Sequence, residues 1–234
     1  IEKDKIVVIY NSYDIEKINR LACESLPEEE KKLFDGINII SVGRLVHSKG
    51  QYHLIRAFKN IINRGINMKL IILGEGELYG YLHDLITNLN LNEFVYILDF
   101  KKNPYKYLAN SNIFVLSSIS EGFPNVLVEA MVCGKPVISS DCKTGPREIL
   151  KSSIDNQISC DKVEYADSGI LVPVCDGIEY SYDEPLTKEE QILSKSIIEL
   201  VNSKELITHY EEQSKKRARA FDSKESISDW ERIV

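Results

Sequence analysis

Two glutamates separated by seven residues are the side chains best placed for chemistry in this 234-residue sequence, in the segment Glu121-Gly-Phe-Pro-Asn-Val-Leu-Val-Glu129. We predict that Pro124 opens a helix, because proline suits the first turn of a helix, where its missing N–H costs nothing. The first backbone N–H groups of such a helix have no partner within it and can bind a phosphate or a sugar oxygen. These groups belong to Asn125, Val126 and Leu127.

The two carboxylates offer hydrogen-bond acceptors on either side of that phosphate position. Each carboxylate could bind a pair of sugar hydroxyls. The alternative interpretation is that both glutamates only complement the positive end of the helix dipole. Against this alternative, Glu129 stands between Val128 and Ala130, in a segment too apolar for a solvent-exposed helix face. The residue types and their spacing therefore favour a binding site.

A basic turn, Gly43-Arg-Leu-Val-His-Ser-Lys-Gly50, follows the first predicted buried strand. Arg44 stands at the end of that strand, and Lys49 stands at the start of the next helix. Two cations beside a helix N-terminus, with the permissive Gly43, could hold a diphosphate. A solvated basic turn is the alternative, since arginine and lysine mostly lie at protein surfaces. Only the combination with the glutamate segment makes the diphosphate interpretation specific.

The remaining motifs give weaker signals. Gly74-Glu-Gly-Glu-Leu-Tyr-Gly80 has the spacing G-x-G-x-x-x-G and follows the second predicted strand, so we interpret it as a tight turn rather than a dinucleotide site. Gly145-Pro-Arg-Glu-Ile-Leu150 is interpreted as a helix start, and Lys215-Lys-Arg-Ala-Arg219 as a solvated helix face. The histidines show no metal-ligand spacing, so we expect no metal site and place all four at the surface: His47, His53, His83 and His209.

The composition excludes several classes of protein. The 29 basic and 36 acidic residues give a net charge of −7, so the overall field does not attract nucleic acid or an anionic membrane, and we expect no nucleic-acid partner. No apolar run approaches the roughly 18 residues of a membrane span. The five cysteines form no C-x-x-C pair, which indicates reduced thiols and a cytoplasmic protein rather than a disulfide framework or a zinc site.

Short apolar runs alternate with amphipathic stretches, a pattern typical of an α/β protein with a Rossmann-like, doubly wound parallel sheet. About six strands are predicted, at residues 37–42, 69–73, 95–98, 113–116, 136–139 and 170–172. The segments 151–168 and 176–185 are predicted to be loops. Thr187 with Glu190 forms a capping-box pattern that starts the C-terminal helices, and a last helix is predicted from Asp222 through Trp230.

We expect three parts in the domain organisation. Residues 1–35 would form an opening segment and linker helix, residues 36–180 the Rossmann-like core, and residues 181–234 the C-terminal helices, packed on the same domain. The sequence begins with Ile1 rather than Met and shows no signal peptide, so we expect it to be part of a longer protein.

Three segments together resemble the donor-binding half of the retaining glycosyltransferases of family 4. They are Gly43-Arg-Leu with Lys49-Gly50, the nine residues from Glu121 to Glu129 followed by Ala-Met, and Gly134-Lys-Pro-Val-Ile-Ser139. The resemblance extends over nearly the whole chain. It implies a GT-B architecture, in which two Rossmann-like domains face a cleft, with this chain as one half. The segment 142–150 is similar to the branch that builds bacterial surface polysaccharides.

The resemblance also implies a role for each site residue. Arg44 and Lys49 would hold the diphosphate of a nucleotide sugar and stabilise its charge as it leaves. Glu121 would contact hydroxyls of the donor sugar, Glu129 would bind the ribose, and the base would lie near Phe100 and Lys101. Arg44, Lys49 and Glu121 would be catalytic. The implied substrate-binding set is Gly43, Arg44, Lys49, Phe100, Lys101, Glu121, Gly122, Phe123, Pro124, Asn125, Val126, Leu127 and Glu129.

The implied function is transfer of a hexosyl or N-acetylhexosaminyl unit from a nucleoside-diphosphate sugar, with UDP favoured, to a glycan or lipid-linked acceptor in bacterial surface-polysaccharide synthesis. Neither a metal nor another cofactor is expected. The acceptor would bind the family's first domain, which this sequence lacks, so we expect the chain to be inactive alone. The intact enzyme would be cytoplasmic or peripheral at the inner face of the membrane.

Other functions stay open beside this one. A non-catalytic module that binds a nucleotide sugar would keep the same ligands, and a nucleotide-sugar epimerase of similar two-domain build would share the fold. A dinucleotide-dependent oxidoreductase would need G-x-G-x-x-G after the first strand, where this sequence has Gly43-Arg-Leu-Val-His-Ser.

Overall fold

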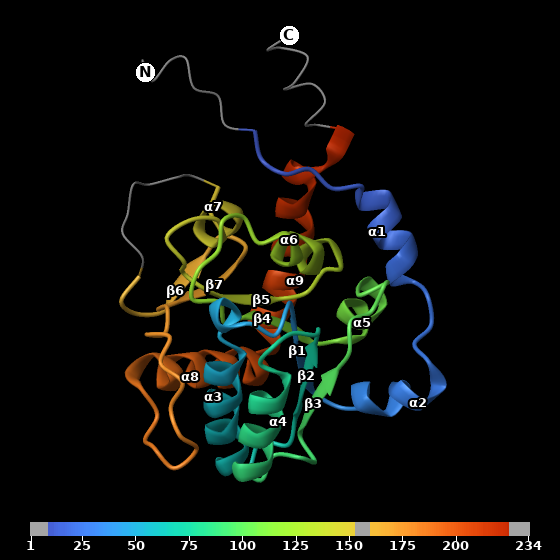
Figure 1. Ribbon diagram of the computed structural model, residues 1–234. Helices are drawn as coiled ribbons and strands as arrows, with labels where there is room; N and C mark the ends of the chain where they lie inside the picture. The colour runs from blue at the N-terminus through green and yellow to red at the C-terminus, as the bar shows by residue number, and fades with distance from the viewer. Residues whose placement is uncertain (1–8, 153–159, 225–234) are drawn as a thin grey trace.

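The computed structural model of the chain describes residues 9–152 and 160–224, and it confirms the predicted α/β architecture (Figure 1). One sheet of seven strands has the order β3-β2-β1-β4-β5-β7-β6. Neighbouring strands are parallel except for β6, which pairs antiparallel with β7. The strands are β1 (Asn38–Val42), β2 (Lys69–Leu73), β3 (Val95–Leu98), β4 (Ile113–Leu116), β5 (Val137–Ser140), β6 (Glu164–Ala166) and β7 (Gly169–Val172).

Helices connect the parallel strands and cover both faces of the sheet (Figure 1). The α-helices are α1 (Ile15–Ala22), α2 (Glu28–Lys31), α3 (Gln51–Asn63), α4 (Tyr79–Asn88), α5 (Tyr105–Asn110), α6 (Asn125–Val132), α7 (Pro146–Leu150), α8 (Lys188–Asn202) and α9 (Lys204–Ala218). Short 3-10 turns are η2 (Lys32–Phe34), η3 (His47–Lys49) and η4 (Arg219–Phe221).

Alternate residues of the strands face two separate apolar cores, as the period of two in a strand requires. Ile39 of β1 packs in the core under α3, α4 and α8. Its neighbour Ile40 packs in the core under α1, α5, α6 and α7. Because both faces are covered, the strands are continuous apolar runs, and this is why the sequence predicted them.

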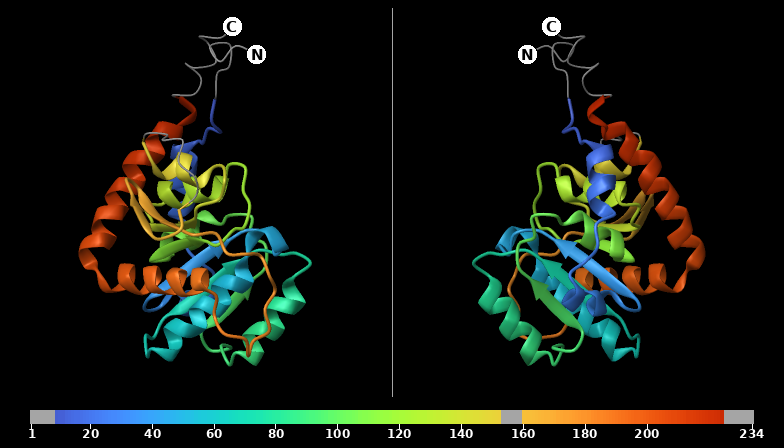
Figure 2. Two further views of the ribbon diagram at one scale, coloured as in Figure 1. Left: turned by 90° about the vertical axis from the view of Figure 1, so that its left-hand side faces the viewer. Right: turned by 90° about the vertical axis from the view of Figure 1, so that its right-hand side faces the viewer.

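Helices α8 and α9 meet at an angle and wrap around the sheet from one face to the other (Figure 2). Tyr210, in the middle of α9, belongs to the core on the α3 side, whereas Ala218, at its end, belongs to the core on the α6 side. The chain after α9 then lies beside the start of the described chain. Tyr13 donates its backbone N–H to the Phe221 carbonyl at 2.9 Å and accepts from the Ser223 N–H at 2.9 Å.

Two predictions from the sequence are wrong in part, one for the segment 151–168 and one for the end of α9. The segment 151–168 was expected to be a loop, but it contributes β6, whose three residues are too few to show a strand period. The basic run that ends α9 was expected to be a solvated helix face, which holds for the exposed Lys215, Lys216 and Arg219 but is wrong for Arg217. Arg217 instead donates from Nε to the Ile149 carbonyl at 2.8 Å and so caps the end of α7. The predicted helix through Trp230 and residues 1–8 of the opening segment lie largely outside the described residues.

Candidate functional site

The carboxyl ends of β1 and β4 lie side by side at the centre of the sheet, where the strand order reverses. Ligands of open α/β sheets bind in the crevice outside this point. The two segments singled out in the sequence follow these two strands. The basic turn 43–50 follows β1, and Glu121 lies in the loop that joins β4 to α6. The topology therefore brings both segments to one place.

A cavity of about 550 Å³ opens at this edge, outside the ends of β1, β2 and β3. Four of the predicted substrate-binding residues line it: Gly43, Arg44, Phe100 and Lys101. Phe100 is 65% exposed, which leaves a large apolar ring at the edge of the cavity. Such a ring is suited to packing against a planar group.

The glycines after β2 allow close packing beside this cavity. A Cβ added to Gly74 would lie 2.0 Å from the Gly43 carbonyl oxygen, and one added to Gly76 would lie 2.4 Å from the Leu45 carbonyl oxygen. The Leu45 N–H donates to the Glu75 carbonyl at 2.8 Å, which ties the two turns together. The interpretation of these glycines as a tight turn with close backbone packing is confirmed.

The two predicted cations differ in their surroundings. Arg44 is exposed at the cavity. Lys49 lies in η3, and its Nζ is 2.6 Å from Oε1 of Glu121, with side-chain exposures of 22% and 9%. The Ser118 hydroxyl donates to the same carboxylate oxygen at 2.6 Å. Lys49 and Glu121 therefore form one charge-paired unit, although the sequence suggested separate roles for them.

Helix α6 begins shortly after Glu121 in the chain, and Pro124 at its N-cap confirms the predicted helix start. Within the described chain, the backbone N–H groups of Asn125 and Val126 have no backbone acceptor. The prediction is wrong for Leu127, whose N–H donates to the Pro124 carbonyl at 3.0 Å. Two N–H groups rather than three therefore face outward from the first turn.

The Asn125 side chain is engaged by the segment that precedes α1. Its Oδ1 accepts from the Tyr13 hydroxyl at 2.7 Å and from Asn11 Nδ2 at 2.9 Å. Burial, together with the charge of the Glu129 carboxylate, raises the pKa of Tyr13. The opening segment thus fixes the first residue of α6.

Glu129 lies one turn further along α6 and is largely withdrawn from solvent. Burial raises the pKa of its carboxyl group, and one hydrogen bond from Tyr105 lowers it only in part. The Tyr105 hydroxyl donates to Glu129 Oε1 at 3.3 Å. Burial and the same carboxylate raise the pKa of Tyr105 to about 12. Tyr105 follows Pro104, which lines the cavity, so Glu129 is connected to the cavity through α5.

Two predicted residues direct their side chains to partners within the protein. The Phe123 ring stacks on Tyr10 at a centroid distance of 5.3 Å and meets Phe221 edge-on at 5.8 Å. It therefore joins the opening segment to the end of the described chain rather than lining the cavity. Lys101 lines the cavity, but its Nζ lies 2.6 Å from Glu30 Oε1 and so ties β3 to α2.

The loop that carries Gly122 and Glu121 is held by residues after β5. The Thr144 hydroxyl donates to the Glu121 carbonyl at 2.6 Å. A Cβ on Gly145 would lie 2.5 Å from the Gly122 carbonyl oxygen, so only glycine fits there. The Gly145 N–H donates to Glu148 Oε1 at 3.0 Å, which confirms the predicted start of α7.

Sequence reasoning missed several residues of this site: Tyr13, Tyr105, Ser118 and Thr144. Tyr105 had a usable signal, because it follows a helix-starting proline after the third strand. The others reach the site through tertiary contacts, which no local pattern shows. The surface assignment is also wrong for His53, which is fully buried, with Nδ1 2.8 Å from Oε1 of Glu190.

Within residues 9–152 and 160–224, no group of three His, Cys, Asp or Glu side chains is arranged to hold a metal ion. Over the same residues, no helix has both the length and the apolar character that a membrane crossing requires. The metal-free reaction remains a prediction.

Known proteins share this sequence pattern. The family model for glycosyl transferases group 1 matches residues 24–168. An uncharacterised glycosyltransferase of Methanocaldococcus jannaschii is 39% identical over 237 residues, covering 99% of this chain and 58% of that protein. A 4-alpha-N-acetylgalactosaminyltransferase of Campylobacter jejuni is 33% identical over 222 residues, covering 95% of this chain and 51% of that protein. The chain thus spans just over half the length of these relatives.

Solved structures share the fold. The crystal structure of Anabaena HepE in complex with UDP matches with a TM-score of 0.72 at 24% identity, over 97% of this chain and 57% of that one. A Staphylococcus aureus TarM mutant, in complex with ligands that include UDP, matches with a TM-score of 0.72 at 19% identity, over 100% of this chain and 40% of that one. The chain therefore belongs to the glycosyl transferases group 1 family and has the fold of one half of a GT-B enzyme.

Proposed function

We propose that this chain is the donor-binding domain of a retaining glycosyltransferase and binds a nucleoside-diphosphate sugar. The observation that carries the proposal is the Lys49–Glu121 contact at 2.6 Å, which joins the basic turn after β1 to the loop between β4 and α6 at the point where the strand order reverses. UDP is the favoured nucleotide, because the Anabaena and S. aureus proteins of the same fold are described in complex with UDP.

The diphosphate would lie between the basic turn and α6. Arg44 and Lys49 supply charge, and the outward N–H groups of Asn125 and Val126 supply hydrogen bonds. Glycosyl transfer passes through an oxocarbenium-like transition state, in which the leaving diphosphate gains negative charge. Positive groups fixed at that position stabilise the transition state more than the ground state. The proposed reaction needs no metal ion.

The two glutamates would bind different hydroxyls of the donor. Glu129, beside Tyr105, would accept from the ribose, and Glu121 would accept from the donor sugar. Because Glu121 Oε1 also lies 2.6 Å from Lys49 Nζ, removing this carboxylate would release the lysine that binds the diphosphate. Glu121→Gln should therefore affect the binding of free nucleotide as well as nucleotide sugar, although the family resemblance implied only a contact with the donor sugar.

The whole protein would transfer a hexosyl or N-acetylhexosaminyl unit to a glycan or lipid-linked acceptor in surface-polysaccharide synthesis, on the cytoplasmic side of the membrane. Two relatives support this part. The Campylobacter enzyme is named for an acceptor linked to diphospho-undecaprenol, and a S. aureus relative, 32% identical over 146 residues, is named for capsular polysaccharide biosynthesis. The acceptor would bind a further domain, so residues 1–234 should bind donor without transferring it.

The test of donor binding is calorimetry with UDP, GDP and ADP and their sugars. Arg44→Ala and Lys49→Ala should each weaken UDP binding by about 2 kcal/mol, the value for a hydrogen bond to a charged group. Arg64→Ala and Lys216→Ala, which remove exposed cations elsewhere, serve as matched controls and should leave the affinity unchanged. Unaltered UDP affinity in both site variants would remove the diphosphate clamp from the proposal.

A turnover assay separates the alternatives. UDP-sugars and lipid-linked acceptors are supplied to this chain and to the full-length protein, and transfer is expected only from the full-length protein, because an unpositioned acceptor forfeits about 7–11 kcal/mol of barrier lowering. Efficient transfer by this chain alone would contradict the two-domain requirement. Epimerised sugar from donor alone would favour an epimerase, and binding without turnover by either protein would favour a non-catalytic module.

A further inference from the structure

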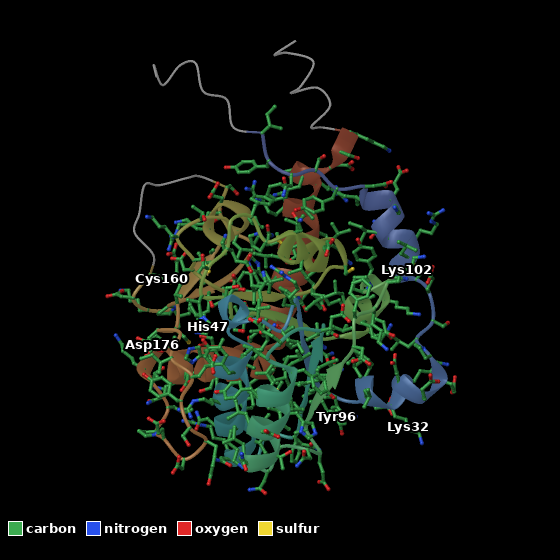
Figure 3. The ribbon with its side chains drawn as sticks, in the orientation of Figure 1. Lys32, His47, Tyr96, Lys102, Cys160 and Asp176 are labelled. Atoms are coloured by element: carbon green, nitrogen blue, oxygen red, sulfur yellow. The ribbon has the colours of Figure 1, made fainter. Side chains whose placement is uncertain are left out.

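The loop that joins β7 to α8, residues 173–187, reaches back to the basic turn that follows β1. Figure 3 shows His47 of that turn and Asp176 of this loop on the same side of the molecule. The His47 Nε2 lies 2.7 Å from the Gly177 carbonyl oxygen, and because a carbonyl can only accept, Nε2–H is the donor. The Tyr52 hydroxyl donates to the same oxygen at 3.0 Å. The Gly177 carbonyl thus accepts hydrogen bonds from His47 and Tyr52, which stand on either side of Lys49 in the sequence.

The far part of the loop is fixed to a rigid frame. Arg56 of α3, only 1% exposed, donates to the carbonyls of Glu184 at 3.2 Å and Pro185 at 2.9 Å, and also to that of Ser181. Its Nε lies 2.9 Å from Oε1 of Glu190, at the start of α8. Three carbonyls and one carboxylate around one buried guanidinium leave the loop little freedom to move away from α3.

Gly177 is packed where the loop meets the turn. Its φ is +81°, and an added Cβ would lie 3.2 Å from Cδ1 of Ile119 and 3.4 Å from Cε1 of His47. Ile119 follows β4, and its N–H donates to the Ser48 carbonyl at 2.8 Å. The turn η3 is therefore held from two directions, by the backbone after β4 and by the carbonyl after β7.

We propose that the Gly177 carbonyl, with His47 and Tyr52, is a brace that positions Lys49 for the diphosphate. His47 of η3 and Tyr52 of α3 are positioning residues, since they act on Lys49 through their hydrogen bonds to the Gly177 carbonyl. The brace rests on the proposed function for its ligand. It adds a role for the loop 173–187, whose sequence gave no functional signal.

The test compares two ligands on single variants. Tyr52→Phe and His47→Ala should each weaken UDP binding about fivefold, the factor for one neutral hydrogen bond, and leave uridine binding unchanged, because uridine lacks the diphosphate. His47→Gln should restore UDP affinity, since a glutamine amide can donate to the same carbonyl. Tyr182→Phe and His83→Ala are matched controls at exposed positions, 51% exposed for Tyr182 and 62% for the His83 side chain.

Hydrogen exchange of the turn gives a readout that needs no ligand. The Lys49 N–H donates to the Val46 carbonyl at 3.0 Å. This amide should exchange faster in Tyr52→Phe and His47→Ala than in the two control variants. The brace alone would be overturned if Tyr52→Phe and His47→Ala lost UDP and uridine affinity equally. It would also be overturned if these two variants kept their UDP affinity while Lys49→Ala lost it. If the unmutated chain and all variants fail to bind UDP, the proposed function fails instead.

Discussion

Glu190 is fully buried and Glu129 is partly buried, and their carboxylates receive very different numbers of hydrogen bonds. Burial alone would raise the pKa of Glu190, but hydrogen bonds from His53, Arg56 and the Thr187 N–H lower it overall. These donors lie at 2.8, 2.9 and 3.0 Å. Glu129 has the Tyr105 hydroxyl at 3.3 Å, and burial leaves its pKa raised.

The different number of hydrogen bonds distinguishes a carboxylate that stabilises the fold from one that is available to bind a ligand. A buried carboxylate that its own protein satisfies contributes to the native state, whereas one that keeps unfilled acceptor sites disfavours it. A carboxyl group with a pKa perturbed in this way is a candidate for a functional site. Glu190 fits the first description. Glu129, whose remaining acceptors would be filled by ribose hydroxyls, fits the second.

The largest effect, a loss of unfolding free energy, is expected from Glu190→Gln. The variant leaves the buried Arg56 guanidinium facing a neutral amide, and losing one partner of a buried ion pair costs about 3 kcal/mol of unfolding free energy. Urea denaturation at neutral pH measures the loss, with Glu189→Gln on the same helix as the control. A loss no larger than that of the control would show that the cluster contributes little. In the unmutated chain, the Glu190 contribution is present above pH 4.5 and is lost as the pH falls through its lowered pKa.

Glu129→Gln should change binding and stability in opposite directions. UDP affinity should fall about tenfold, because the amide replaces a charged acceptor for the ribose. The unfolding free energy should rise at pH 7, because the raised pKa of Glu129 means that its ionisation opposes folding. This gain should vanish as the pH falls below 4.5, where the carboxyl is protonated in both states. A variant that loses stability at pH 7 would assign Glu129 to the structural class.

The smallest effect is expected from Tyr105→Phe. The ring and its packing remain, and only the donor to Glu129 is lost, so the pKa of Glu129 should rise further and UDP affinity should fall about threefold. Carboxyl titration by NMR and calorimetry measure the two changes. Tyr96→Phe is a suitable control, because that hydroxyl donates at 2.8 Å to the Glu93 carbonyl, away from the cavity. An unchanged pKa in Tyr105→Phe would mean that the hydroxyl has no influence on the acid.

The sequence predicted those parts of the fold that local pattern determines. Doubly buried strands are continuous apolar runs, so the six parallel strands were found within about a residue at each end. The placement of Arg44 and Glu121 after two adjacent strands followed from the same pattern, and their roles in binding stay predictions. The three residues of β6 have no such pattern, and its pairing depends on β7 alone.

The errors concern side chains whose partners are distant in sequence. Nothing near His53 shows that Glu190 lies beside it, and nothing near Phe123 shows that Tyr10 stacks on it. A polar residue on an apolar helix face is expected to turn toward solvent unless a partner is known. Leu127 is a local error, since its N–H closes a turn tighter than the α-helix that was assumed.

The pairing of β1 with β4 has a consequence for how the molecule opens. β1 is in register with β2 from Asn38 to Val42, but with β4 only at Ile39 and Ile40. The strand pairing that joins β1–β3 to β4–β7 is therefore short, and buried side chains join the same two parts away from the strands, among them Arg56 of α3 and Glu190 of α8. Separating the two parts therefore requires the buried Arg56–Glu190 pair to break as well as the strand pairing. A nucleotide that contacts both the turn after β1 and the loop after β4 would hold these two parts together. The backbone amides of both parts would then exchange more slowly when the nucleotide binds.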